Sequence, residues 1–425
     1  MFNNFLGTIK KYTKPITEYI KKHKILLILI LGLIIRLVLM PFFTWKDLIS
    51  TYQRAYEVTF NGENLLNYGQ PLSHLIEVIN LYIYDIFFKS NHLLPLSRFK
   101  SENPYVNFNL FFFKLPYLIF DILSFFILKG LIKNKKSQVI SLAFYFLNPI
   151  LIFSVYMFGR YETFPIAFLL ISLYFIKKNK FILSTFTFSL AILSRTSFII
   201  LAPIYFILIG KNFRQKILIS ILTLLPFVFT VIYKVIILNN LSGIKWLLDG
   251  HHVNFLLGSK LESGVGTNIY PFIISYSVTI YFAIKDWILN KSNWEKCTFY
   301  LFITLAQYYS LCYFHPQYLS WIIPLIAILL ANIKNKTEIL ILNIVISLLF
   351  IPLLLCWGNN LLFSLAYPIS DNLGSIDISG KISEYYDPIK LSNIAKSIIS
   401  ACFILQIYNL ISNKKIIKKK SRNID

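Results

Sequence analysis

Long apolar runs alternate with short basic stretches along the whole chain, and this pattern predicts a bundle of membrane-spanning helices. A helix that crosses a bilayer needs about 20 mostly apolar residues. The candidate spans are 25–43, 106–129, 138–156, 162–176, 181–195, 196–210, 217–238, 269–285, 297–313, 318–333, 339–358 and 391–412. The short pair at 181–195 and 196–210 could instead form one re-entrant hairpin. We therefore expect an all-α polytopic membrane protein of about 12 transmembrane helices, with a single membrane domain over 25–412.

Basic clusters between the spans predict the orientation of the chain. One precedes the first span and the others follow every second span, so all are on one face: Lys10–Lys24, Lys129–Lys136, Lys177–Lys180, Lys211–Lys216, Lys285–Lys296, Lys334–Lys336 and Lys414–Arg422. Cytoplasmic loops of membrane proteins are enriched in Lys and Arg. The basic N-terminus (1–24) and the basic tail (413–425) are both expected in the cytoplasm. The expected location is the cell membrane, or the endoplasmic reticulum membrane in a eukaryotic source.

Three longer segments are predicted to lie on the opposite, non-cytoplasmic side, at 44–105, 239–268 and 359–390. The first contains IEVINLYIYDIFF, whose apolar residues recur at helical spacing with few charges. Such a helix suits the membrane interface. The first outer loop is therefore expected to contain interfacial helices.

Composition supports a membrane protein and excludes several other classes. Of the 425 residues 56% are hydrophobic and only 14% are charged, whereas soluble domains carry about 25% charged residues. The net charge of +23 follows the positive-inside pattern, so no nucleic-acid partner is expected. The cysteines form no CxxC pair and predict neither a metal site nor a disulfide framework; they are Cys297, Cys312, Cys356 and Cys402.

Several ionisable side chains are predicted to lie near the outer ends of the spans. A charge at the centre of a membrane helix costs about 2.5–3.5 kcal/mol on insertion scales, which makes each of them a candidate functional residue. They come from five separated stretches of the chain: Arg36, Asp47, Arg160, Glu162, Arg195 and His315. Their common depth on one face favours a shared site.

Most of these residues also have a simple structural explanation. Arg36 could reach the lipid headgroups, and Asp47 could cap an interfacial helix. Arg160 and Glu162 could form an ion pair, and His315, next to a proline, could lie at a capped helix end. The structure has to decide between these explanations and a shared site.

The chemistry of the predicted cluster follows from its residue types. A carboxylate at the water interface can act as a general base. Guanidinium groups bind phosphate in a bidentate manner, and positive charge stabilises a phosphate group as it leaves. A base and a phosphate-binding site at lipid depth favour sugar transfer from a lipid-phosphate donor.

The order of these residues resembles that of the GT-C glycosyltransferases, integral membrane enzymes that use polyprenyl- or dolichyl-phosphate sugars. The resemblance covers most of the first 330 residues. The first outer loop has the family's order of Asp, Tyr, Ala, Gly and Tyr, at Asp47, Tyr52, Ala55, Gly62 and Tyr68. The next span, FKLPYLIFDILSFFIL, is similar to the family's Lys-Leu-Pro plus Asp span, at Lys114, Pro116 and Asp121.

Three later segments continue the resemblance. The stretch from FYFLNP to GRYETF resembles the family's Asn-Pro plus Gly-Gln-x-Asp segment, at Asn148, Pro149, Gly159, Arg160 and Glu162. Arg195 stands where the family usually has Lys. The stretch FHPQYLSW looks like the His-Pro-x-Tyr motif, at His315, Gln317 and Tyr318. The last 90 residues match nothing in the family, although the outer loop around Tyr385–Tyr386 is a candidate for shaping the acceptor site.

Two departures from the family pattern affect ligand binding. Arg160-x-Glu162 replaces the Gln-x-Asp pair, which changes what can be bound there. No second Asp adjoins Asp47, so the DxD metal site of some relatives is absent. We therefore predict no metal site and no cofactor; a divalent metal is possible but is not indicated.

The resemblance implies a hexosyltransferase. The hexose, with mannose as a first guess, would pass from a lipid-phosphate sugar donor to a hydroxyl of a glycan or lipid-linked acceptor on the non-cytoplasmic face. Asp47 is the expected catalytic base, and Glu162 is expected to orient one of the phosphate ligands. The expected phosphate ligands are Arg160, Arg195 and His315. The remaining expected substrate-binding residues are Arg36, Tyr52, Gln317 and Tyr318.

Two other function classes stay open. A flippase or transporter for lipid-linked saccharides would use the same membrane partners, but transporters often have inverted repeats and polar residues at the bilayer midplane. The chain shows neither clearly, and its polar residues lie towards one end of the spans. A polysaccharide polymerase or ligase would share the lipid carrier but not the early Asp-containing loop.

The predicted orientation can be tested by cysteine labelling from outside intact cells. Single cysteines at Gly62, Ser259 and Ser379 should react, because these positions lie in predicted outer loops. Cysteines at Asn179 and Asn335 should not react. Labelling at either of the last two positions would reverse the orientation.

Overall fold

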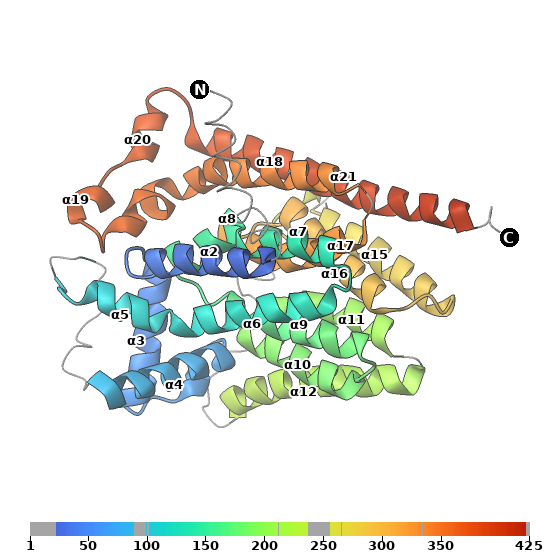
Figure 1. Ribbon diagram of the computed structural model, residues 1–425, viewed down its shortest axis with the longest axis horizontal. Helices are drawn as coiled ribbons and strands as arrows, with labels where there is room; N and C mark the ends of the chain where they lie inside the picture. The colour runs from blue at the N-terminus through green and yellow to red at the C-terminus, as the bar shows by residue number, and fades with distance from the viewer. Residues whose placement is uncertain are drawn as a thin grey trace, which may run out of the picture.

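The computed structural model describes residues 23–88, 99, 102–210, 212–236, 256–264, 266–333 and 335–421, with the backbone alone from 413 onward. Helices dominate this part of the chain (Figure 1). The longer ones are α2 (Lys24–Leu39), α3 (Lys46–Phe60), α4 (Pro71–Phe88), α5 (Val106–Phe113), α6 (Leu115–Leu131), α7 (Lys135–Phe146), α9 (Thr163–Lys177), α10 (Phe181–Ser194), α11 (Ala202–Ile209), α12 (Phe213–Ile236), α15 (Pro271–Ile288), α16 (Trp294–Leu311), α17 (Ile323–Asn332), α18 (Lys336–Leu354) and α21 (Pro388–Ser421).

Shorter elements connect these helices. They are α8 (Pro149–Ile152), α19 (Asp371–Gly374), α20 (Ile378–Ser383), the π-helix η3 (Phe153–Met157) and the 3-10 helices η1 (Leu65–Asn67), η4 (Thr196–Leu201), η5 (Pro316–Trp321), η6 (Leu355–Leu361) and η7 (Phe363–Ala366). Two short strands, β1 (Leu261–Glu262) and β2 (Asn268–Ile269), form an antiparallel hairpin. This hairpin belongs to the predicted outer loop 239–268, most of which lies outside the described residues.

A helical segment coincides with each predicted span, and the chain is an all-α membrane protein. Five segments of the described chain are long and apolar enough to cross a bilayer: Val106–Leu131, Lys135–Met157, Phe213–Ile236, Lys336–Leu361 and Pro388–Ser412. Several others are shorter. The α10 helix has 14 residues, which at 1.5 Å per residue gives a length of about 21 Å, less than the bilayer core of about 30 Å. The total of twelve spans stays a prediction.

The first and last predicted outer segments lie at one end of the bundle (Figure 1). Most helices run along its long axis, and α3 crosses one end at a steep angle to them. The helices α5, α19 and α20 lie at that same end, whereas α21 runs to the opposite end, where the chain finishes. The first and last predicted outer segments therefore meet, as a common outer site requires.

The α4 helix contains the segment that was expected to lie in the membrane interface. Its buried positions include four polar residues at helical spacing: Ser73, His74, Glu77 and Asn80. Its exposed positions are mainly apolar and include Ile79, Ile83, Ile86 and Phe87. An apolar exposed face beside a polar buried face suits contact with lipid rather than water. The helix is confirmed, and its depth in the membrane stays a prediction.

Gly159 allows the turn before α9 to approach α3. Its φ of 82° lies in the left-handed region, which glycine adopts without steric cost. A Cβ at this position would lie 3.0 Å from the Leu48 side chain, so a larger residue would push the turn away from α3. Gly62 has a positive φ of 73°, and the neighbouring exposed Asn61 is a better place for the outer labelling cysteine.

A buried ion pair joins three segments of the membrane domain. Arg36 Nε on α2 lies 2.7 Å from Asp121 Oδ2 on α6, and both side chains are fully buried. The hydroxyl groups of Tyr145 and Tyr156 donate to the same carboxylate at 2.8 and 2.9 Å. Arg36 Nη1 also donates to the carbonyl oxygen of Phe146 at 2.7 Å. Arg36 therefore does not reach the headgroups, and the explanation by lipid contact is wrong.

Lys114 fixes the stretch that leads from α2 to α3. Its fully buried ammonium group donates to the carbonyl oxygens of Met40, Phe43 and Tyr156 at 2.9, 2.5 and 2.9 Å. An ammonium has three N–H donors, so all three are used. The backbone N–H of Thr44 donates to a carbonyl oxygen in η7, which ties the last outer segment to the same stretch.

Removing one partner of the buried ion pair should destabilise the protein strongly. Asp121→Asn leaves the Arg36 charge without its counter-ion, and breaking a buried pair in this way costs about 3–5 kcal/mol. Replacing both residues, as Arg36→Met with Asp121→Leu, should recover much of this loss because no unpaired charge remains. Thermal unfolding of the purified variants in one detergent measures both effects. Equal destabilisation of the single and double variants would contradict the electrostatic explanation.

Candidate functional site

Glu162 and Arg195 form the buried centre of the candidate site. Arg195 Nη2 lies 3.6 Å from Glu162 Oε1, and the indole N–H of Trp321 donates to Glu162 Oε2 at 2.5 Å. Trp321 and Glu162 are 0% exposed, and Arg195 is 1% exposed. Glu162 precedes α9, Arg195 lies between α10 and η4, and Trp321 ends η5. Three segments that are distant in the sequence therefore meet at one carboxylate.

Aromatic rings surround the Arg195 guanidinium. Its Cζ lies 4.6, 5.7 and 5.8 Å from the ring centroids of Tyr318, Trp321 and Tyr161, distances at which cation–π attraction operates. Gln70 accepts a hydrogen bond from Arg195 Nη1 at 3.2 Å and another from the Tyr161 hydroxyl. The Arg195 Nε–H has no hydrogen-bond partner within the described chain. Contacts from several segments therefore hold the guanidinium in place.

Asp47 and Arg160 extend this cluster towards the surface. Arg160 Nη1 lies 3.5 Å from Asp47 Oδ2, with side chains that are 12% and 41% exposed respectively. Arg160 Cζ also lies 4.9 Å from the Tyr161 ring, which connects this pair to Arg195. Its Nε–H is buried and finds no hydrogen-bond partner among the described residues. The site therefore runs from an accessible carboxylate, past two guanidinium groups, to a buried carboxylate.

The structure disagrees with two of the simple structural explanations. Asp47 lies in the first turn of α3, whose N-cap is Trp45 and has no side-chain capping bond. Asp47 is therefore not the cap, although a carboxylate in the first turn interacts favourably with the helix dipole. Arg160 and Glu162 do not form the expected ion pair with each other, because Arg160 pairs with Asp47 and Glu162 pairs with Arg195.

The candidate residues of the His-Pro-x-Tyr stretch lie at the start of η5; they are His315, Gln317 and Tyr318. His315 is the half-buried N-cap of η5, and its ring centroid is 5.8 Å from that of Tyr318. It also lies 5.9 Å from the ring of Trp357 in η6, a residue that the sequence analysis did not select. Gln317 is 1% exposed, and its Oε1 has no hydrogen-bond partner among the described residues. The Tyr318 ring thus lies close to both His315 and the Arg195 guanidinium.

Two predicted substrate-binding residues lie apart from this cluster. Tyr52 is buried and packs against Phe113, with ring centroids 5.1 Å apart. Arg36 is bound to Asp121 at the buried cluster described above.

The α4 helix and the turn before it also contribute to the site, although the sequence motifs do not indicate them. Gln70 binds Arg195 directly, and the His74 ring lies 6.2 Å from Tyr161. Burial, aided by the nearby charges of Arg54, Arg160 and Lys234, lowers the pKa of His74 to about 3, so the ring is neutral at physiological pH. The polar residues at helical spacing in this otherwise apolar helix could have indicated it as a wall of the site.

Glu77 on α4 is a second buried carboxyl group behind the site. It is fully buried and interacts with the Tyr117 hydroxyl on α6, although neither carboxyl oxygen has a hydrogen-bond partner of good geometry among the described residues. Burial raises the pKa of Glu77 well above its ordinary value. Burial therefore favours the neutral form of this carboxyl group.

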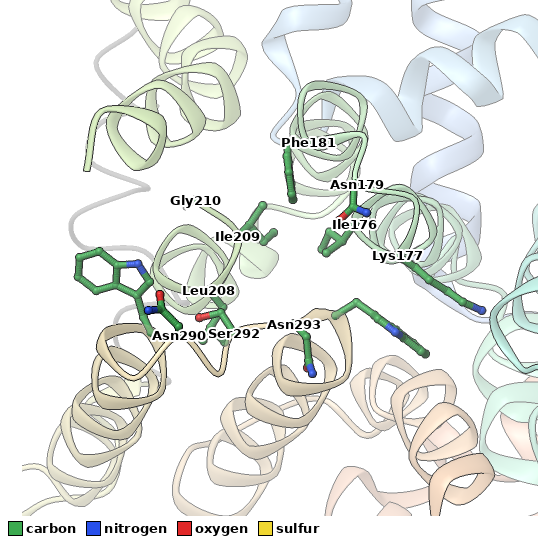
Figure 2. A pocket seen from close by; sticks show the side chains of 12 residues that line it. Ile176, Lys177, Asn179, Phe181, Leu208, Ile209, Gly210, Asn290, Ser292 and Asn293 are labelled. Atoms are coloured by element: carbon green, nitrogen blue, oxygen red, sulfur yellow. The ribbon is translucent and has the colours of Figure 1, made fainter. Parts of the chain in front are cut away.

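A separate pocket of about 360 Å³ lies at the ends of α9, α11 and α15 (Figure 2). Its lining includes Lys177, Trp287 and Trp294. The Lys177 ammonium donates to two carbonyl oxygens at the C-terminal end of α6. It therefore caps that helix. None of the predicted site residues lines this pocket. It is therefore distinct from the Asp47–Arg195 cluster.

Within the described ranges, no group of three His, Cys, Asp or Glu side chains is arranged to hold a metal ion. The positively charged groups of the cluster are the guanidinium groups of Arg160 and Arg195. No family model matches the chain, and no curated protein matches it significantly. The geometry and chemistry of these residues are the basis for interpreting the site.

Proposed function

We propose that the protein is a glycosyltransferase that moves a hexose from a polyprenyl-phosphate donor to an acceptor hydroxyl. The observation that supports this proposal best is the connected row of Asp47, Arg160 and Arg195, with the exposed carboxylate at one end. A transferase of this kind needs a base beside two groups that bind phosphate. The proposed fold class is GT-C, on the order of residues given above.

Asp47 is the proposed catalytic base. Its carboxylate is accessible, stands at the start of α3 and adjoins Arg160. In the proposed reaction the acceptor oxygen attacks the anomeric carbon of the sugar while Asp47 takes the hydroxyl proton. The bond between that carbon and the donor phosphate oxygen breaks, and the phosphate leaves with the electron pair. Direct displacement of this kind inverts the anomeric centre.

Arg160 and Arg195 are the proposed ligands of the donor phosphate. Both have a buried Nε–H without a hydrogen-bond partner among the described residues, and a phosphate oxygen could accept from each. Two fixed guanidinium groups stabilise the negative charge that develops on the leaving phosphate. Glu162 and Trp321 hold Arg195 in place and thus act as positioning residues. His315 is proposed to extend the donor site beyond the Tyr318 ring.

The placement of α3 supports an acceptor site on the outer side. This helix crosses the end of the bundle, and the last outer segment lies at the same end (Figure 1). Tyr385 in that segment is 88% exposed, which makes it available for contact with a large acceptor. The polar cluster lies towards this end and not at the centre of the spans, an arrangement that favours transfer at the surface over transport through the bilayer.

The activity can be tested directly with the purified protein. It should transfer a radiolabelled hexose from polyprenyl-phosphate mannose or polyprenyl-phosphate glucose to a mixture of glycan and lipid-linked acceptors. A transporter would instead move the labelled lipid across a proteoliposome membrane without forming a new glycosidic bond. Movement of the lipid without any product would favour the transporter alternative.

The role of Arg195 can be separated from general stabilisation. Arg195→Ala should weaken donor use more than acceptor use, because only the donor carries the phosphate. Arg195→Lys should restore part of the activity, because it returns the charge without the planar guanidinium. Arg54→Ala, which removes an exposed arginine of α3, is the control. If Arg195→Ala folds and leaves the donor KM and kcat unchanged, Arg195 does not bind the donor.

The strongest prediction concerns Asp47. Asp47→Asn keeps the shape of the side chain and removes its basicity, so turnover should fall by about 10²–10⁴-fold. Asp47→Glu should retain little activity, because a displacement of about 1 Å can cost around 10²-fold. Glu63→Gln removes another exposed carboxylate of the same loop and should leave turnover unchanged. A well-folded Asp47→Asn protein with normal transfer rates would eliminate Asp47 as the base.

A further inference from the structure

A groove of about 600 Å³ lies between α2, α6 and α7. It occupies the start of α2, the end of α6 and the start of α7, and therefore the end of these helices remote from Asp47. Its apolar lining comes from all three helices: Ile25, Leu26, Leu29, Phe125, Phe126 and Val139. The groove is open along one side and can take a hydrocarbon chain.

Three lysines and a histidine line the same groove: Lys24, Lys129, Lys135 and His23. All three lysines are exposed, and no aspartate or glutamate is among the lining residues. Among the described residues none of the three ammonium groups has a carboxylate within 4.0 Å. The groove therefore combines an apolar floor with uncompensated positive charge.

Two helix N-termini add to this positive potential. The α2 helix begins at Lys24, and its N-cap has no side-chain capping bond. The α7 helix begins at Lys135, and the side chain of its N-cap Asn134 accepts a hydrogen bond from the Ser137 N–H. A helix N-terminus carries roughly half a positive charge and exposes backbone N–H donors, both of which favour an anion. Together with the lysines, they define where a negatively charged group would lie.

We propose that this groove binds an anionic phospholipid of the surrounding membrane. The headgroup phosphate lies among Lys24, Lys129 and Lys135, and an acyl chain follows the apolar lining. Basic pockets between membrane helices on the cytoplasmic side recognise lipid headgroups in this way. The Arg36–Asp121 pair joins α2 and α6 deeper in the domain, so the lipid completes their packing at the opposite end. This proposal is independent of the proposed transferase activity.

Native mass spectrometry of the full-length, delipidated protein tests the proposal. The protein is titrated with dioleoylphosphatidylglycerol, which is anionic, or with dioleoylphosphatidylcholine, which is not. The wild type should bind the anionic lipid at least about tenfold more tightly than the phosphatidylcholine. Each lysine near an anionic membrane surface strengthens binding by a several-fold factor. The triple variant Lys24→Gln, Lys129→Gln, Lys135→Gln should lose this preference, and the corresponding triple arginine variant should keep it.

A matched variant distinguishes binding in the groove from non-specific attraction of the lipid to other exposed lysines. Lys178→Gln, Lys285→Gln and Lys291→Gln remove the same charge from exposed lysines outside the groove. This control should bind phosphatidylglycerol within about twofold of wild type. Equal losses in the two glutamine triples would overturn the proposal, as would a wild type without preference. Displacement of the lipid by millimolar inorganic phosphate would indicate a simple anion site and would also overturn it.

Discussion

The structure depends on the rule that a charge buried in a membrane domain must have a partner. Water is absent there, and an unpaired ionic group costs several kcal/mol. Arg36 therefore pairs with Asp121, and Lys114 uses all three of its donors on carbonyl oxygens. Arg195 meets Glu162 under the same constraint. Each of these contacts joins segments that are far apart in the sequence, so the polar residues determine how the apolar helices are assembled.

The geometry of the candidate site follows from these contacts. Lys114 holds the stretch before α3 to the π-helix η3, and Gly159 lets the following turn approach Leu48. As a result Asp47 lies 3.5 Å from Arg160. Exposure decreases from Asp47 through Arg160 to Arg195. A base needs access to its acceptor, and guanidinium groups bind phosphate most strongly where water is excluded, so this gradient matches the proposed chemistry.

The candidate site and the proposed lipid groove lie at opposite ends of the helices α2, α6 and α7. At one end α2 and α6 lead to the stretch before Asp47 and to Lys114, and at the other end α2, α6 and α7 form the groove proposed to bind an anionic lipid. The Arg36–Asp121 pair lies between these ends. A lipid wedged into the groove would support the packing on which the position of α3 depends. Lipid composition would then affect stability without any contact between the lipid and the candidate site.

The apolar runs predicted the all-α class and the places of the helices, and the charges near their ends indicated Asp47, Arg160, Glu162 and Arg195 as candidate site residues. Apolar runs and charges within them are local features, so they can be read without coordinates. The partners of these residues became evident only from the folded chain. Glu162 pairs with Arg195 and not with Arg160, and Arg36 pairs with Asp121. Gln70 and Trp321 form hydrogen bonds within the site. Such pairings depend on helices that meet over long sequence separations, and hydrophobic periodicity contains no information about which neighbour a buried charge will find.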